Sequence, residues 1–565
     1  MEGVADAVAA TEPVAIPSLR SLAGSLLSAL GQGRALAGEA VTLGAEVGRI
    51  ARGSSTLAPA ASDRRFADRT WSENGLYRRL AQFYLASGGS LNRLVDRLEE
   101  DAADWHRVEQ ARFAAGILLS ALAPTNNLIT NPAAMKRAYE TGGQSLVRGA
   151  RNWVWDLRHN GGMPSQVDRT AFEVGRDLAL TPGAVVARDQ VGELIQYTAS
   201  TPQVRARPVL IVPPPIGRFY FLDLRPGRSF VEHTVRRGLT TFMLSWRNPG
   251  PEQGDWDFDT YATRIIDAVE SVREITGSED VNVIGFCAGG IISTAALNHL
   301  AATKRPIVHT MSYSVTLLDF GIQAPIGAFS SKAVLDLARS GSRRKGVIDA
   351  RSMGSVFTWM RPDDLVFNYW VNNYLMGEKP PAFDILAWNA DGTNLPAALH
   401  EQFLDMFSEN TLCEPGRVSV LGTPIKLKSI TVPTFVTGAI TDHLTPWKGC
   451  YRTTQLLGGE STYLLSNGGH IASLVNPPGN PKASFQIGKA GGGDPAAWAA
   501  GAERRTGSWW EAWADWVTAR SGAERAAPAR LGSRRHRPLE AAPGLYVRDL
   551  KPEPGPQRAR TRRAP

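Results

Sequence analysis

Residues 281–290 read VNVIGFCAGG, and the ten residues after them, IISTAALNHL, have the composition of a buried helix. The first six residues form a mostly apolar, β-branched run that is typical of a buried strand. A nucleophile flanked two residues away on both sides by glycine, between a strand and a helix, indicates a nucleophile elbow, a sharp turn that exposes its middle residue at the end of a sheet. The following helix presents free N–H groups and a positive dipole end, which favour a thiolate or an oxyanion. The segment therefore predicts that Cys287 is a nucleophile at the end of a central strand.

The chain of 565 residues has three cysteines, Cys287, Cys413 and Cys450. They are too few and too scattered for a disulfide framework or a Cys-rich zinc site, and such usage fits a reducing cytoplasm. A lone buried cysteine is commonly an inert packing residue. The glycines around Cys287 favour the nucleophile there, whereas Cys413 and Cys450 lack this setting and are expected to be packing residues.

Short apolar runs alternate with helical stretches after Pro208. Strands alternating with helices predict an α/β fold with a mainly parallel sheet and helices on both faces. The predicted strands are Val209–Val212, 240–246, Val281–Phe286, 309–315, 434–437 and 462–465, and two of the predicted helices are 260–276 and Ala288–Ala302.

Changes in composition and hydrophobic pattern along the chain predict its division into domains. Residues 1–62 are rich in Ala and Gly and are expected to be partly disordered, apart from one helical stripe at Leu19, Leu22, Leu26 and Leu30. Residues 63–201 are expected to form an N-terminal helical domain, and residues 202–548 the catalytic domain. The alternation lapses at about 320–430, which is too long for a loop, and this predicts a cap insertion beside the site. Residues 549–565 are expected to be a basic tail rich in Pro and Arg.

The elbow fold supplies its catalytic partners in the order nucleophile, acid, histidine. Asp442 follows a predicted buried strand at 432–438, and His470 follows a glycine-rich loop after the predicted strand at 462–465. We therefore expect Asp442 to be the acid and His470 the general base. The alternatives are a helix cap or turn role for Asp442, a satisfied loop histidine at position 470, and His443 as the base.

The oxyanion hole of this fold uses the N–H of the residue after the nucleophile, here Ala288, and a second N–H from the loop after an early strand. That loop reads PPPIGR at 213–218. Because proline has no N–H, Ile216 or Gly217 must supply the second donor, and Ile216 is the expected one.

A cysteine nucleophile suits a thioester substrate. A thiolate that attacks a thioester exchanges sulfur for sulfur, so the acyl group stays reactive toward a later acceptor. This chemistry favours acyl transfer over the hydrolysis of a stable ester or amide.

The net charge of +8 is concentrated at one end of the chain. Residues 521–565 contain eleven Lys or Arg and four Asp or Glu, so the rest is nearly neutral and predicts no face for nucleic acid. A solvated tail is the expected role, with loose polyanion binding as the alternative.

No apolar run approaches the 18 residues of a membrane span, and no Lys or Arg precedes Arg20 as a secretory signal requires. We expect an intracellular protein without a transmembrane segment.

Several motifs together resemble the polyhydroxyalkanoate synthases, single-subunit polyester synthases with an α/β-hydrolase-type fold. The resemblance extends from about residue 63 to residue 548. Its motifs are DRRFAD (63–68), WSEN (71–74), TGGQSL (141–146), SWRNP (245–249), GFCAGG (285–290), FNYW (367–370), WNAD (388–391), TDH (441–443), PW (446–447), GHI (469–471), NPP (476–478) and APGLYV (542–547).

The resemblance implies that (R)-3-hydroxyacyl-CoA thioesters are the substrates and that polyester and free coenzyme A are the products. Cys287 would carry the acyl chain, His470 would deprotonate it, and Asp442 would orient His470 or help to activate the 3-hydroxyl of the incoming monomer. No metal or cofactor is implied, since coenzyme A is part of the substrate. Similar enzymes form homodimers and lie in the cytoplasm on polyester granules with granule proteins.

The sequence leaves three questions about function open. The segment 285–287 resembles synthases of short-chain monomers, whereas 141–147 and 157–160 resemble those of medium-chain monomers. The same triad would also serve a thioesterase or polyester hydrolase. A catalytically inactive granule-associated protein is the third reading, in which the tryptophan-rich segment 509–516 would bind a surface; a helix packed on the core is the favoured role for that segment.

Overall fold

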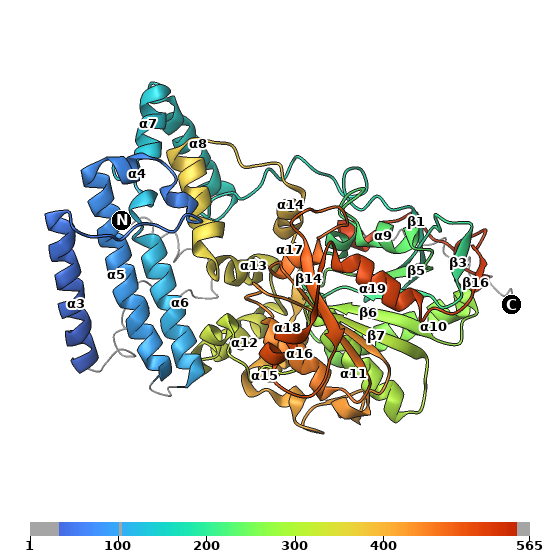
Figure 1. Ribbon diagram of the computed structural model, residues 1–565. Coiled ribbons are helices and arrows are strands. Elements are labelled where there is room, and N and C mark those ends of the chain that lie inside the picture. The colour runs from blue at the N-terminus through green and yellow to red at the C-terminus, as the bar shows by residue number, and fades with distance from the viewer. Residues whose placement is uncertain (1–32, 101–103, 551–565) are drawn as a thin grey trace. The chain divides into compact units, whose positions relative to one another are not determined.

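The computed structural model describes residues 33–100 and 104–550 (Figure 1). The predicted stripe from Leu19 to Leu30 and nearly all of the predicted tail lie outside these residues. The chain divides into two compact units. Of the described residues, the sheet unit comprises Phe172–Asp319 and those from Leu412 onward, and the helical unit comprises those up to Ala171 together with Phe320–Thr411. In the described part of the chain, no helix is long and apolar enough to cross a membrane.

The sheet unit is built on a ten-stranded sheet of order β1-β2-β5-β4-β6-β7-β12-β13-β14-β15. Its six central strands, from β5 to β13 in that order, are parallel, and antiparallel strands extend both edges. The central strands are almost entirely buried, as expected for parallel strands covered on both faces. The strands are β1 (Gly183–Arg188), β2 (Gly192–Tyr197), β4 (Val209–Val212), β5 (Thr241–Trp246), β6 (Val281–Phe286), β7 (Val308–Ser314), β12 (Thr434–Ala439), β13 (Ser461–Ser466), β14 (Ser484–Lys489) and β15 (Glu503–Thr506).

Helices connect the parallel strands and pack on them, which confirms the predicted α/β class. Helix α10 lies between β5 and β6 in the chain, α11 between β6 and β7, and α16 between β12 and β13. The helices of this unit are α9 (Phe230–Arg236), α10 (Phe258–Thr276), α11 (Ala288–Ala302), α16 (Trp447–Leu456), α17 (His470–Leu474), α18 (Pro495–Gly501) and α19 (Trp509–Thr518). Two small ladders join β3 (Gln203–Arg205) to β16 (Glu524–Ala526) and β10 (Ser419–Val420) to β11 (Thr423–Pro424).

The helical unit draws on two distant parts of the chain. Its helices are α3 (Gly33–Arg52), α4 (Thr70–Glu73), α5 (Gly75–Glu100), α6 (Trp105–Ala121), α7 (Pro132–Glu140), α8 (Gln144–His159), α12 (Lys332–Lys345), α13 (Ala350–Trp359), α14 (Asp384–Ala390) and α15 (Ala397–Glu409). The short strands β8 (Val347–Ile348) and β9 (Leu395–Pro396) pair in its second segment.

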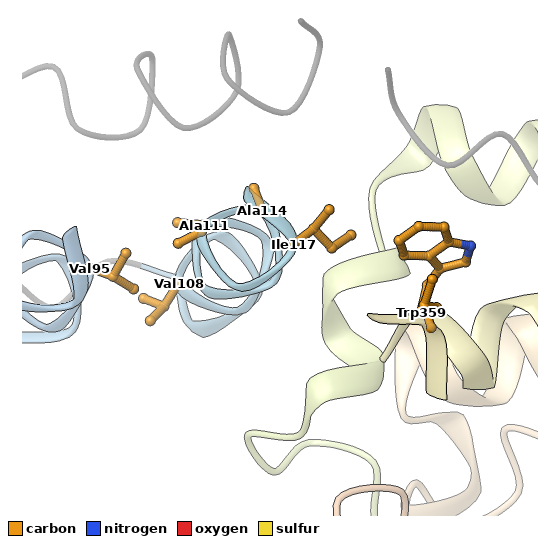
Figure 2. Packing of buried hydrophobic residues seen from close by; sticks show 8 residues of the cluster. Val95, Val108, Ala111, Ala114, Ile117 and Trp359 are labelled. Carbon is orange, nitrogen blue, oxygen red and sulfur yellow. The ribbon is translucent and has the colours of Figure 1, made fainter. Parts of the chain in front are cut away.

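One hydrophobic core joins these two parts. Val95 of α5 lies opposite Val108 of α6, and Ile117 of α6 points toward Trp359 of α13 (Figure 2). A second close approach occurs at Gly149 of α8, where a Cβ atom would collide with the backbone of residue 374. Residues 320–411 are therefore an integral part of the helical unit.

This division differs from the organisation expected from the sequence. The expected helical domain reaches residue 201, but β1 and β2 form a hairpin that joins the sheet beside β5, so the helical part ends at 171. The expected cap insertion at 320–430 was assigned to the catalytic domain, but 320–411 group with the N-terminal helices and 412–430 with the sheet. Both differences depend on contacts between distant residues, which local hydrophobic periodicity does not report.

Candidate active site

The turn between β6 and α11 holds Cys287 in an unusual backbone conformation. Its φ is 48° and its ψ is −123°, outside the usual range for a residue with a side chain. Such a conformation costs of the order of 1–3 kcal/mol and persists only where the surroundings impose it. Here the Cys287 N–H donates to the Ser314 carbonyl at 2.9 Å, and Thr316 Oγ1 donates to the Cys287 carbonyl at 3.1 Å. The end of the neighbouring strand β7 thus holds the elbow in place.

Three glycines permit the close packing around this turn. A Cβ atom on Gly285 would lie 2.6 Å from the Cα of Gly290, and one on Gly290 would collide with the Thr316 side chain. A Cβ atom on Gly289 would lie 2.5 Å from the Val212 carbonyl oxygen and 2.6 Å from that of Pro213. These obstacles are mainly backbone atoms, which cannot move aside as a flexible side chain can.

Gly289→Ala is expected to destabilise the protein by about 1–3 kcal/mol, because its methyl group must displace the backbone after β4. Thermal unfolding of the purified variant measures this loss. The matched control is Gly341→Ala in α12, where a Cβ atom meets nothing within 4 Å. This control should be neutral or more stable by up to about 1 kcal/mol, as for any Gly-to-Ala change within a helix. Equal stability of the two variants would contradict the crowded elbow.

Asp442 and His470 come together from the ends of two adjacent parallel strands. Asp442 follows β12, and His470 is the first residue of α17 after β13. The His470 Nδ1 lies 2.7 Å from Asp442 Oδ2. The structure thus places His470 against the acid, as expected for the base.

Asp442 is anchored by further hydrogen bonds. Its Oδ1 accepts the N–H groups of Leu444 and Thr445 at 2.8 and 2.9 Å, and its Oδ2 accepts the Thr445 hydroxyl at 2.6 Å. The turn role considered for Asp442 is therefore present together with its contact to His470. Thr445 was not identified from the sequence; an aspartate in a turn commonly bonds the backbone N–H two residues on, which points to residue 444 and not to Thr445.

The surroundings favour the charged forms of both side chains. Burial by itself raises the pKa of Asp442, but the His470 charge and hydrogen bond and the two bonds from Thr445 hold this pKa below its usual value. Burial by itself lowers the pKa of His470, but the charge and hydrogen bond of Asp442, together with those of Cys287, raise it to about 10. Asp442 is therefore a carboxylate that faces His470 in its imidazolium form.

Cys287 lies close enough to His470 that its side chain helps to raise the pKa of that histidine. Because Nδ1 faces Asp442, Nε2 is the ring nitrogen left for the thiol. Cys287 is partly exposed, whereas Asp442 and His470 are buried. The sulfur is thus the member of the three that a substrate can reach.

The other two cysteines have different surroundings. Cys450 is buried and its Sγ donates to the Thr445 carbonyl at 3.5 Å, and the Cys413 Sγ donates to the Leu318 carbonyl at 3.0 Å. Burial raises the pKa of both thiols, and the Asp319 charge raises that of Cys413 further. Both cysteines are therefore held in the unreactive thiol form.

The loop after β4 lies against the first turn of α11, as the crowded Gly289 shows. Two anchors hold this loop. Trp246 Nε1 donates to the Pro213 carbonyl at 2.8 Å, and the buried Arg218 guanidinium pairs with Asp549 at 2.6 Å and donates to the Tyr546 carbonyl. The loop is thus fixed beside the nucleophile, where an oxyanion donor is needed. Ala288 and Ile216 remain the predicted donors.

Two family models match consecutive parts of the chain. A family model described as "Poly-beta-hydroxybutyrate polymerase (PhaC) N-terminus" matches residues 62–234, and a model of the alpha/beta hydrolase fold matches residues 224–477. The second match confirms the α/β-hydrolase-type fold expected from the sequence.

Curated relatives extend the similarity over nine-tenths of the chain. Poly(3-hydroxyalkanoate) polymerase 1 of Ectopseudomonas oleovorans is 45% identical over 506 residues, which cover 90% of each chain. Polymerase 2 of the same organism is 45% identical over 508 residues, again 90% of each chain. The poly(3-hydroxyalkanoate) polymerase subunit PhaC of Cupriavidus necator is 40% identical over 506 residues, 88% of this chain and 85% of the relative.

Proposed function

The chain belongs to the poly(3-hydroxyalkanoate) polymerase family, and from this membership we propose that it polymerises (R)-3-hydroxyacyl-CoA thioesters into polyester with release of coenzyme A. One structural observation supports this proposal independently of family membership. Cys287, His470 and Asp442 lie together at the ends of three strands of one sheet. A nucleophile, a base hydrogen-bonded to it and an acid that orients the base are the parts that acyl transfer requires.

In the acylation step, the Cys287 thiolate attacks the thioester carbonyl of the substrate. His470 holds the thiol proton, and its raised pKa means that the imidazolium which results is stable beside Asp442. A new carbon–sulfur bond forms to Cys287, the bond to the coenzyme A sulfur breaks, and the departing thiolate takes the proton from His470. The N–H of Ala288 and that of Ile216 would stabilise the negative charge on the carbonyl oxygen.

In the elongation step, the 3-hydroxyl of the next monomer attacks the acyl group on Cys287. Neutral His470 accepts the hydroxyl proton as the ester bond forms, and the Cys287 thiolate leaves. The lengthened chain, still a coenzyme A thioester, then acylates Cys287 again with release of coenzyme A. These steps require no metal ion or redox cofactor, since coenzyme A enters as part of the substrate.

The geometry of Asp442 favours one of its two expected roles. Its side chain is fully buried, and both carboxylate oxygens already accept hydrogen bonds from residues 444, 445 and 470. A saturated, buried carboxylate has no free lone pair directed at a substrate hydroxyl. We therefore assign Asp442 to the orientation and charging of His470, which then activates the hydroxyl.

Asp442→Asn is expected to slow elongation strongly while it permits slow acylation. The amide removes the negative charge that raises the pKa of His470, and it can present an N–H to Nδ1, so the wrong tautomer is favoured. In a serine protease the corresponding change costs about 10,000-fold in rate, which sets the expected order of the loss. Rapid-quench measurement of the first coenzyme A release and of later turnover separates the two steps. An unchanged polymer yield would contradict the role of Asp442.

Turnover of (R)-3-hydroxybutyryl-CoA by the purified protein tests the proposed function directly. Release of coenzyme A together with insoluble polymer is the expected result. Coenzyme A with free hydroxy acid alone would show a thioesterase, and no release with either a four-carbon or a ten-carbon substrate would indicate an inactive protein. The relative rates on these two substrates also decide between short-chain and medium-chain preference.

Family membership also supports a cellular setting. We propose that the protein works as a homodimer in the cytoplasm at the surface of polyester granules, beside other granule proteins. A polymer that grows on Cys287 is insoluble in water, so the enzyme must stay attached to the material that it makes.

A further inference from the structure

The helix that carries His470 is too short to fix its own position. Helix α17 spans His470–Leu474, five residues, and His470 is its first residue. Forming a single helical turn is unfavourable without outside support. The direction of the imidazole therefore depends on Asp442 at its Nδ1 and on what holds the other end of this helix.

The start of α19 holds that end through three hydrogen bonds. Trp509 Nε1 donates to the Ser473 carbonyl at 2.7 Å, and Trp510 Nε1 donates to the Leu474 carbonyl at 3.1 Å. Ser508 Oγ donates to the Asn476 carbonyl at 2.5 Å. The last carbonyls of a helix have no partner within it, and here indole and hydroxyl groups supply those partners. Both indoles are only 1% exposed, so water cannot replace them.

The same two indoles also pack on the ring of Phe230 in α9, which in turn contacts the strand before the nucleophile. The Phe230 ring centroid lies 5.7 Å from that of Trp509 and 5.4 Å from that of Trp510. It also lies 5.5 Å from the ring of Phe286, the residue directly before Cys287. Close-packed aromatic side chains deform little, so this cluster fixes the end of β6 relative to the end of α17.

We propose that Trp509 and Trp510 are positioning residues, which hold α17 where His470 faces Cys287. Their N–H groups fix the helix, and their contact with Phe230 sets the helix against the strand that leads to the nucleophile. Neither indole touches the reacting atoms. The proposal rests on the roles proposed above for Cys287 and His470.

Trp509→Phe and Trp510→Phe test this proposal, because each keeps a large ring and removes the N–H. The matched control is Trp513→Phe in the same helix, whose N–H donates to Ser312 Oγ at 3.0 Å and whose ring also packs on Phe230. The measurements are kcat and KM for polymerisation, and the rate at which iodoacetamide alkylates Cys287 across the pH range. A misplacement of about 1 Å can cost of the order of 100-fold in rate. We therefore expect kcat to fall by about 10-fold or more with KM within about twofold of the wild type, and the control to keep its kcat within about twofold.

The alkylation rate reports the pairing of Cys287 with His470 without any substrate. In Trp509→Phe and Trp510→Phe, iodoacetamide should alkylate Cys287 more slowly than in the wild type and with a displaced pH profile. In Trp513→Phe, the alkylation rate of Cys287 should match that of the wild type. If the wild type made no polymer while this pattern persisted, the proposed function would fail and the positioning role would stand. If the two variants matched Trp513→Phe in both alkylation and kcat, the positioning role would be overturned.

Ser508→Ala provides a milder variant should the tryptophan changes prevent folding, as judged by thermal unfolding. It removes the bond to the Asn476 carbonyl, just after α17, and the cap that Ser508 Oγ gives α19 by accepting the Trp510 N–H, and it keeps both indoles. We expect a smaller loss of alkylation rate in the same direction. A rate and pH profile equal to those of the wild type would overturn the proposal.

Discussion

Cys287→Ala is expected to reduce coenzyme A release and polymer formation by at least about 1,000-fold, as the loss of a catalytic nucleophile does in other triads. The methyl side chain occupies the same elbow at the same φ, so the hydrogen bonds of Cys287 to Ser314 and Thr316, which use backbone atoms of residue 287, can be kept. The loss should therefore come from the missing sulfur and not from unfolding. Cys287→Ser should leave a trace of activity, because a neutral hydroxyl is a much weaker nucleophile than a thiolate.

Cys413→Ala is the matched control for this prediction. Cys413 is partly exposed like Cys287, but its thiol donates to a backbone carbonyl and lies outside the triad. The control should polymerise within about threefold of the wild-type rate, as expected for a thiol without a catalytic role. Full activity in Cys287→Ala, or equal losses in the two variants, would refute Cys287 as the nucleophile.

His470→Gln is expected to suppress acylation by several orders of magnitude, as triad removals do. Glutamine has a similar reach but cannot carry a proton between the thiol and a leaving group. It also deprives the buried Asp442 of its cationic partner, so a lower unfolding temperature should accompany the loss of activity. Single-turnover release of coenzyme A measures the acylation step, and circular dichroism checks that the variant is folded.

His443→Gln is the matched control, since His443 directly follows Asp442 in the chain, whereas it is His470 whose Nδ1 lies 2.7 Å from Asp442 Oδ2. We expect its acylation rate to stay within about threefold of the wild type, which is the usual range for a residue outside the reacting groups. A large loss in His443→Gln with a small loss in His470→Gln would reverse the assignment of the base.

The parallel core of the sheet could be predicted from the sequence because its strands are buried. Val209–Val212 and Val281–Phe286 were predicted with the bounds that the structure has, and 309–315 differs from β7 by one residue at each end. The edge strand β15 carries no such signal. All four residues of β15 are exposed, and its sequence ERRT is charged, as is common where a strand edge faces water.

The residues of the candidate site likewise fall into those that the sequence predicts and those that it does not. Cys287, Asp442 and His470 could be proposed because each follows a recognisable buried strand, and parallel strands end at one edge of a sheet. The residues that hold these three and the neighbouring loop in place could not be proposed from the sequence. The bonds of Trp509 and Trp510 join residues 36 apart in the chain, and the anchor of Arg218 to Asp549 joins residues 331 apart. Such contacts depend on tertiary packing, which no local pattern encodes.

The most direct measurement is the mass of the protein quenched in acid shortly after mixing with (R)-3-hydroxybutyryl-CoA. The account predicts a hydroxybutyryl adduct on the peptide that contains Cys287, present in the wild type, removed by neutral hydroxylamine and missing from Cys287→Ala. Coenzyme A release without any adduct, or an adduct on Cys413 or Cys450, would contradict it.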